Sequence, residues 1–203
     1  KFRGKYYLIV SLFRPDRRRG SMILAADSVR GPFVPLTGEY ITPQGWLCLD
    51  ATLFVSNGKP YLYFSNEWVD PITADGDGSL YVAALSDDLK TLASRPKKIV
   101  SGKYCGFSRE VRSGEAAGYV AEGPFAVEED GKIALYWSTF SKDGYCVAKS
   151  TAADVFGEYT FERMIFERDG GHAMIFTDLN GRRKIVLHQP NTSPDERMKI
   201  FEL

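Results

Sequence analysis

The segment GKPYLYFS at residues 58–65 combines a turn glycine, a lysine and a run of alternating β-forming side chains. The same pattern occurs as GKYYLIVS at 4–11, as GKIALYWS at 131–138 and as GRRKIVLHQ at 181–189. Repetition of one β-rich unit along a chain is typical of radial or stacked β architectures. The four copies therefore predict a fold built from one repeated β unit.

Length and composition favour an all-β fold with a sizeable core. The 203 residues include 13 Phe, 11 Tyr and 3 Trp, and the 19 Gly and 10 Pro supply turns for many short strands. A single domain of this size buries roughly 70% of its unfolded surface. Lys plus Arg and Asp plus Glu number 26 each, so no net charge recruits nucleic acid or an anionic membrane. We therefore expect a neutral or small partner.

The cysteines and the hydropathy pattern exclude other classes of protein. Cys48, Cys105 and Cys146 are far apart and form no CxxC pair, so neither a disulfide framework nor a zinc site is indicated. No run approaches the roughly 18 apolar residues of a membrane span, and no secretory leader is visible. Because residue 1 already approaches a strand, an exported precursor is compatible with the sequence, and localisation stays undecided.

Each repeat extends beyond its turn into a meander of strands. The predicted strands of the second repeat are at about 50–56, 60–65, 79–85 and 97–101. The third repeat follows the same pattern, whereas the first lacks an innermost strand and the last lacks an outermost one. Four-stranded units of this spacing are typical of β-propeller blades around a channel. We expect residues 1–203 to form one propeller domain that is incomplete at its N-terminus and, by the missing strand, at its C-terminus.

Three ionisable residues precede the turn glycine by eight or nine positions in successive repeats. They are Asp50 in LDATLF, Glu122 in AEGPF and His172 in GGHAMIF. Equivalent positions in a radially repeated fold converge on its axis, so we expect these side chains at one end of a shared channel. A carboxylic acid paired with a carboxylate is what hydrolysis of a glycosidic bond needs. The competing interpretation is that acidic residues start strands as turn or capping groups.

Longer strings around these residues share one order and spacing. They are LDATLF followed by SNGKPYLYFS, AEGPF followed by EEDGKIALYWS, and GGHAMIF followed by NGRRKIVLHQP. They resemble the second, third and last motif regions of glycoside hydrolase family 43, the five-bladed β-propeller arabinofuranosidases, arabinanases and β-xylosidases. SVRGPF at 28–33 and LSDDLKTL at 85–92 also resemble recurrent segments of that family. The resemblance covers nearly all of the chain and implies four-stranded antiparallel blades, of which this chain covers about four.

The resemblance also implies a reaction and a role for each residue. Enzymes of the family cleave α-L-arabinofuranosyl or β-D-xylosyl linkages of plant-derived glycans with inversion, so an oligosaccharide or polysaccharide would be the substrate. Glu122 would be the general acid, and Asp50 the carboxylate that orients it and tunes its pKa. His172 would be an axial histidine, which in family members often sits near a water-coordinated calcium. No cofactor is required, and a structural calcium near the axis is compatible with the resemblance.

One element of the family pattern is missing from this sequence. The family's catalytic base is an aspartate of the first blade, at a position that falls before Lys1 in this numbering. We therefore expect residues 1–203 to lack the base and to be poorly active on their own. A noncatalytic carbohydrate-binding propeller is the alternative that this departure leaves open.

Other side chains are weaker candidates for substrate contacts. Glu67 in SNEW follows the second strand of its blade and would project over the cleft. Trp46 and Trp68 flank motif segments, and a flat indole ring can stack on a sugar face. The competing interpretations are a solvent-facing glutamate and core-packing tryptophans.

Three further features are given structural interpretations. The arginine-rich run at 14–19 lies between two predicted strands and is interpreted as a solvated loop rather than a phosphate site. DGDG at 75–78 is interpreted as a hairpin loop, because the glycine and glutamate that an EF-hand loop requires are absent from the necessary positions. His188 in LHQP is interpreted as a hydrogen-bonded rim residue.

Overall fold

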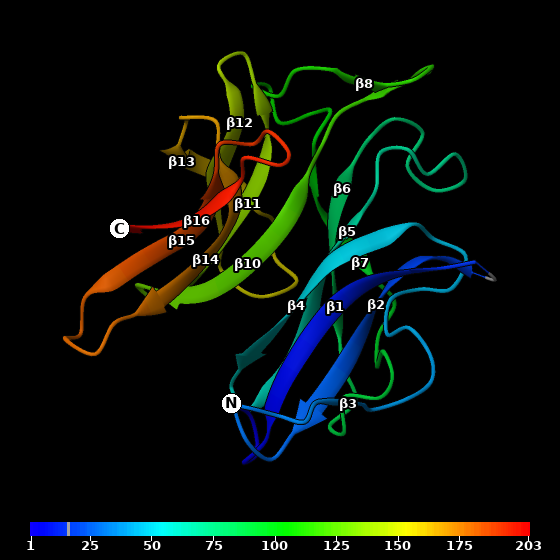
Figure 1. The fold of residues 1–203 in the computed structure, drawn as a ribbon, viewed down its shortest axis with the longest axis vertical. Helices are drawn as coiled ribbons and strands as arrows, with labels where there is room; N and C mark the ends of the chain where they lie inside the picture. Colours follow the sequence, from blue (N-terminus) through cyan, green and yellow to red (C-terminus); the bar gives the residue numbers. More distant parts are fainter. Residues whose placement is uncertain (16) are drawn as a thin grey trace.

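The computed structural model describes residues 1–15 and 17–203, and among these residues the regular elements are all strands. Four main sheets follow one another in chain order, and their strands pair antiparallel (Figure 1). The strands β1, β4, β10 and β14 contact one another in that order, so the sheets are arranged around a shared centre. No helix in this part of the chain is long and apolar enough to span a membrane. The all-β prediction is confirmed.

Two of the sheets have four strands each. One consists of β4 (Cys48–Ser56), β5 (Lys59–Asn66), β6 (Ser79–Ala84) and β7 (Lys97–Ser101). The other consists of β10 (Glu122–Glu129), β11 (Lys132–Ser141), β12 (Gly144–Ala152) and β13 (Thr160–Phe166). Both sheets have the up-and-down strand order of a propeller blade, as predicted for the second and third repeats.

The first and last sheets have three strands each. The first consists of β1 (Tyr6–Arg14), β2 (Arg17–Ala26) and β3 (Val34–Pro35). The last consists of β14 (Gly171–Thr177), β15 (Arg183–Gln189) and β16 (Arg197–Glu202). The motif GKYYLIVS forms β1 as GKPYLYFS forms β5, so the first sheet begins at a second-strand position. The described residues do not close a ring, and five blades stay a prediction.

A two-stranded ribbon, which the repeat pattern did not predict, connects the two four-stranded sheets. It consists of β8 (Val111–Ser113) and β9 (Ala116–Gly118). The main core lies between these sheets and includes Tyr63, Leu80 and Trp137. The Trp137 indole is 1% exposed, and its Nε1–H donates to Ser150 Oγ at 3.0 Å. This core fixes β4 beside β10.

In the first three copies of the pattern, a serine seven residues after the turn glycine forms a hydrogen bond with the backbone at the start of the next sheet. The bonds run from Asp50 N–H to Ser11 Oγ (2.8 Å), from Ser65 Oγ–H to the Ala121 carbonyl (2.6 Å) and from His172 N–H to Ser138 Oγ (2.9 Å). The repeated pattern therefore specifies more than a strand. Its last residue positions the backbone of the following sheet, including the backbone of Asp50 and His172.

Replacing Ser138 with alanine is expected to lower the free energy of unfolding by about 1–3 kcal/mol. The serine is fully buried, so its loss leaves the His172 N–H without its acceptor. Urea denaturation of Ser138→Ala measures the change. Ser113→Ala, at an exposed position of β8, is the control and should change stability by less than about 0.5 kcal/mol. Equal effects of the two substitutions would contradict the role given to the serine.

Candidate active site

The first strands of the last three main sheets carry a β-bulge at the same place. The pairing shifts beside Asp50 in β4, Gly123 in β10 and His172 in β14. The φ angles of these residues are 56°, 58° and 56°, in the left-handed region that L residues seldom adopt. A bulge breaks the alternation of side chains along a strand and re-aims them. Each of the three strands can therefore direct a side chain toward the shared centre.

The register corrects one detail of the predicted alignment. Glu122 pairs with Ser138 just as Leu49 pairs with Ser65 and Gly171 with His188. Asp50 and His172 are thus equivalent, whereas Glu122 lies one position earlier. Spacing to the turn glycine did not reveal this, because the turn between β14 and β15 is longer than the other two. All three side chains still lie at the same end of their strands.

Asp50 connects the three strands through its carboxylate. Its Oδ2 accepts a hydrogen bond from His172 Nε2 at 2.9 Å and one from the Gly123 N–H at 3.2 Å. A Cβ atom at Gly123 would lie 3.2 Å from the His172 ring, so glycine suits both the close approach and the left-handed backbone. The structure therefore brings Asp50 and His172 into direct contact.

Glu122 is half-buried beside this pair. The Tyr145 hydroxyl donates to Glu122 Oε1 at 2.6 Å and lies 3.2 Å from His172 Nδ1. Burial, followed by the negative charge of Asp50, raises the pKa of Glu122, while His172 and the Tyr145 hydrogen bond act in the opposite direction. A carboxyl group with a raised pKa retains its proton closer to neutral pH, as a general acid must.

His172 lies between Asp50 and Tyr145 in the cluster. Burial lowers its pKa, but the hydrogen bond and charge of Asp50, together with the charge of Glu122, outweigh this effect and raise it above the ordinary value. Both ring nitrogens are engaged, one by Asp50 and the other by Tyr145. These contacts favour the protonated form of the His172 ring.

Glu67 belongs to the electrostatic surroundings of the same cluster. Arg19 Nη1 donates to its Oε1 at 2.5 Å, and the glutamate side chain is 14% exposed. Burial raises the pKa of Glu67, as do the charges of Asp50 and Glu122, against the effect of Arg19. The solvent-facing interpretation is therefore wrong for this glutamate, which is mostly buried in an ion pair.

The solvated-loop interpretation of the basic run is also wrong for Arg18 and Arg19, which belong to β2. Arg18 Nη2 donates to Asp70 Oδ1 at 2.7 Å, and the Asp70 side chain is fully buried. Asp70 also accepts hydrogen bonds from the Leu47 N–H and Thr73. These contacts overcome the effect of burial and lower the pKa of Asp70 to about 2. Asp70 thereby ties β2 to the segments that precede β4 and follow β5.

The two candidate tryptophans have packing contacts. Trp46 is half-buried and packs edge-on against Tyr81, with ring centroids 5.0 Å apart. Trp68 lies against backbone: a Cβ atom at Gly118 would be 2.7 Å from its ring. Trp46 also lines a cavity of about 540 Å³ with Arg18 and Tyr40. A contact of either indole with a sugar stays a prediction.

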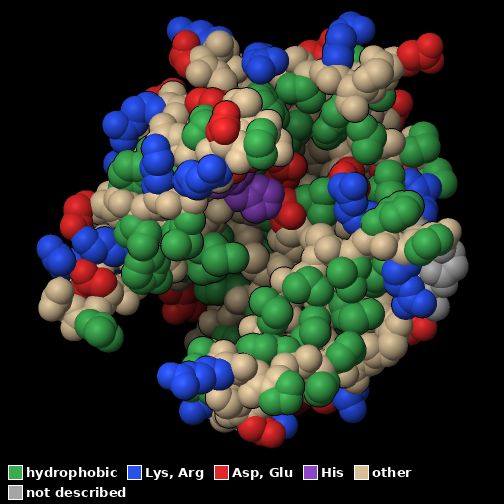
Figure 2. Space-filling view, viewed as in Figure 1, with side chains coloured by type: hydrophobic (Ala, Val, Ile, Leu, Met, Phe, Trp, Pro, Cys, Tyr) green, Lys and Arg blue, Asp and Glu red, His purple; other side chains and the backbone are tan. Residues whose placement is uncertain are grey.

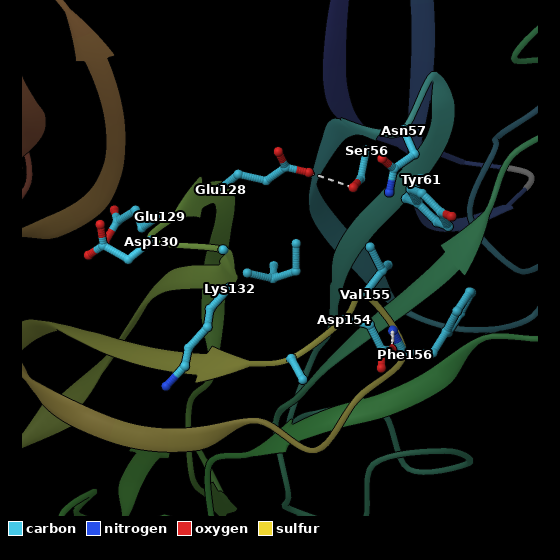
Figure 3. Close-up of a pocket in the computed structure, with 13 residues that line it drawn as sticks. Ser56, Asn57, Tyr61, Glu128, Glu129, Asp130, Lys132, Asp154, Val155 and Phe156 are labelled. Carbon is cyan, nitrogen blue, oxygen red and sulfur yellow. Dashed lines mark hydrogen bonds between the residues drawn. The ribbon is translucent and has the colours of Figure 1, made fainter.

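A cavity of about 310 Å³ opens beside the cluster and is lined by Ser11, Asp50, Thr52, Gly123 and His172, with apolar side chains around them. Figure 2 shows histidine side chains next to acidic atoms at the edge of a hollow. A separate cavity of about 450 Å³ contains Glu128, Asp130 and Asp154 (Figure 3). It lies at the turn ends of β4 and β10, whereas the cluster lies at their beginnings, so the two acidic groups are distinct.

A structural calcium near the axis stays a prediction. In residues 1–15 and 17–203, no group of three or more His, Cys, Asp or Glu is arranged to hold a metal ion. Asp77 of the DGDG segment instead accepts hydrogen bonds from Ser101 Oγ–H and the Lys103 N–H. That segment is a hairpin loop between β5 and β6, as interpreted from the sequence.

Comparison with known proteins gives consistent results. The sequence profile of glycosyl hydrolases family 43 matches residues 1–200. Alpha-L-arabinofuranosidase 43 of Humicola insolens is 32% identical over 154 residues, which are 73% of this chain and 30% of that protein. An extracellular exo-alpha-(1->5)-L-arabinofuranosidase of Streptomyces avermitilis is 32% identical over 131 residues, 64% of this chain and 24% of that protein. This chain thus spans less than a third of the length of either relative.

A solved structure is similar over the whole chain. The endo-arabinase of Bacteroides thetaiotaomicron superposes with a TM-score of 0.94 and 35% sequence identity, covering 100% of this chain and 72% of that one. The similarity therefore extends over all four main sheets and the cluster at their centre.

Proposed function

Because the chain belongs to glycosyl hydrolase family 43, we propose that it cleaves α-L-arabinofuranosyl linkages of plant-derived glycans by an inverting acid/base mechanism, with Glu122 as general acid. The observation that supports this most is the position of Glu122. It is half-buried, it is held by Tyr145, and it shares its surroundings with Asp50 and His172. β-D-Xylosyl linkages are the second candidate, and the three relatives above favour arabinose, since all three names refer to it.

In this mechanism Glu122 donates its proton to the oxygen of the departing group as the glycosidic bond breaks. Asp50 raises the pKa of Glu122 before this step and so keeps the proton available. After the transfer, the Glu122 carboxylate is stabilised by the Tyr145 hydroxyl and by the nearby His172. In an inverting enzyme, a base on the opposite side of the sugar activates the attacking water. We place that base outside residues 1–203, where the family resemblance implies an aspartate.

The test supplies an external nucleophile. Residues 1–203 are incubated with 4-nitrophenyl α-L-arabinofuranoside or β-D-xyloside, with and without sodium azide. Azide can replace base-activated water, so it should increase nitrophenol release and give a glycosyl azide of inverted anomeric configuration. Sugar binding without release under either condition would favour the noncatalytic carbohydrate-binding alternative. Turnover without azide that equals the azide rate would show that a described carboxylate, with Glu67 the first candidate, acts as base.

Glu67→Gln is expected to raise KM about tenfold with a smaller change in kcat. The substitution removes the charge that holds Arg19, and losing one charge of a partly buried pair weakens the site that the pair shapes. Steady-state kinetics with the nitrophenyl arabinofuranoside and azide measure both constants. Glu110→Gln is the control, because Glu110 pairs with Arg112 at an exposed position. A fall in kcat with unchanged KM would instead assign Glu67 to the chemical step.

A further inference from the structure

Tyr145 is the buried centre of the candidate site. Its side chain is 1% exposed, and its hydroxyl lies between Glu122 Oε1 at 2.6 Å and His172 Nδ1 at 3.2 Å. Its ring stacks on His188, with centroids 5.5 Å apart and planes 15° apart. A buried tyrosine needs one hydrogen-bond partner for its hydroxyl, whereas this hydroxyl contacts two groups of the proposed acid machinery.

The surrounding chain holds the ring in place. A Cβ atom at Gly171 would lie 2.1 Å from the Tyr145 ring, so the second glycine of GGHAMIF makes room for it. The Tyr145 carbonyl accepts the Gly170 N–H at 3.0 Å, and Phe140 packs on the ring with centroids 4.8 Å apart. The position of the hydroxyl is therefore fixed by β11, β12 and the start of β14.

The partners set the direction of the hydrogen bonds. The Asp50 carboxylate only accepts, so His172 Nε2 carries a hydrogen. The Tyr145 hydroxyl has one hydrogen, which it donates to Glu122 Oε1. Its oxygen can then accept from a protonated His172 Nδ1. When His172 is protonated, its ring donates to Asp50 on one side and to Tyr145 on the other, and Tyr145 donates to Glu122.

We propose that Tyr145 is the positioning residue of the general acid: by occupying Oε1 of Glu122, it confines the acidic proton to Oε2, the oxygen left for the substrate. The proposal rests on the proposed function of Glu122. A carboxyl group without this contact could rotate or carry its proton on either oxygen. Once the proton has been transferred, the same hydroxyl connects the carboxylate to the positive charge of His172.

The charged and titratable groups that surround Glu122 come from three other strands and one connecting segment. They are Asp50 of β4, His172 of β14 and His188 of β15, with Glu67 in the segment after β5. Tyr145 differs from them because its hydrogen bond stabilises the ionised form of Glu122 without adding a charge. Removing the hydroxyl should therefore raise the pKa of Glu122. Since the acid is active when protonated, the alkaline limb of the pH–rate profile should move to higher pH.

Tyr145→Phe tests the proposal, with Tyr136→Phe as the matched control. Tyr136 is also 1% exposed, lies in the neighbouring strand β11, and donates to a glutamate, Glu129, at 2.7 Å. With azide as nucleophile and a poor leaving group, Tyr145→Phe is expected to lower kcat about tenfold, with KM unchanged. The alkaline limb should shift upward only in this variant. Equal losses of kcat in both variants, or an unshifted limb in Tyr145→Phe, would overturn the proposal.

A measurement that needs no turnover separates this proposal from the proposed function. The carboxyl ¹³C resonance of Glu122, assigned by its loss in Glu122→Gln, is titrated in the unsubstituted protein and in both phenylalanine variants. A higher midpoint in Tyr145→Phe alone supports the positioning role even if no glycoside is cleaved. Unchanged midpoints together with Glu122-dependent cleavage would contradict the positioning role and leave the proposed function standing.

Discussion

Glu122→Ala is expected to lower turnover of glycosides with poor leaving groups by about 10²- to 10⁴-fold, the usual contribution of a general acid. Glycosides with a dinitrophenyl leaving group should retain most of their activity, because that group departs without being protonated. The reason lies in the position of Glu122, which has a raised pKa and is held through one oxygen by Tyr145. The measurement is kcat/KM, with azide, across a series of phenyl leaving groups.

Two other glutamates complete this experiment. Glu128→Ala removes a carboxylate from the far end of the same strand, where Glu128 accepts a hydrogen bond from Ser56, and should leave the dependence on leaving group unchanged. Glu67→Ala should weaken substrate binding without creating such a dependence. If Glu67→Ala shows the dependence and Glu122→Ala loses both kinds of substrate equally, then Glu67 is the acid.

The sequence carried enough information for the sheets because the same local pattern encodes each of them. A turn glycine and an alternating run specify a strand wherever they occur, and the strands of the second and third repeats follow this rule. The ribbon of β8 and β9 lies outside the repeats, so the pattern could not predict it. The sequence pattern did not predict the β-bulges either, because a bulge is recognised by a change of pairing register between two strands.

The sequence predicted the site residues that occupy equivalent positions of the repeats. It did not predict the residues that have no equivalent in the other repeats. Asp50 and His172 occupy equivalent bulges, and their common end of the fold follows from that equivalence. Tyr145 lies in an ordinary third strand, and its importance depends on contacts with β10 and β14. Arg19 reaches Glu67 from a distant part of the sequence. The sequence feature that corresponds to Tyr145 is Gly171 at the start of β14. A glycine within a strand often marks the close approach of another group, and here that group is the Tyr145 ring.

Asp50→Asn is expected to lower the rate about 10²-fold above neutral pH and to have less effect in acid. The negative charge of Asp50 raises the pKa of Glu122. Removing this charge should therefore lower the pKa of Glu122. Because the acid works only when protonated, the alkaline limb of the pH–rate profile should move to lower pH. The pH dependence of kcat/KM with azide measures this shift.

The direction in which the alkaline limb moves tests the roles of Asp50, Tyr145 and Glu122 together. Asp50 opposes ionisation of Glu122 and Tyr145 favours it, so Asp50→Asn and Tyr145→Phe should move the same limb in opposite directions. Asp27→Asn provides the control, since Asp27 pairs with Lys5 at an exposed position. A limb that moves upward in Asp50→Asn would mean that the carboxylate acts mainly by holding His172 in place. If the limb moves downward in Asp50→Asn and upward in Tyr145→Phe, Glu122 is identified as the titrating acid. Asp50 and Tyr145 lie on different strands and act on the pKa of Glu122 in opposite directions.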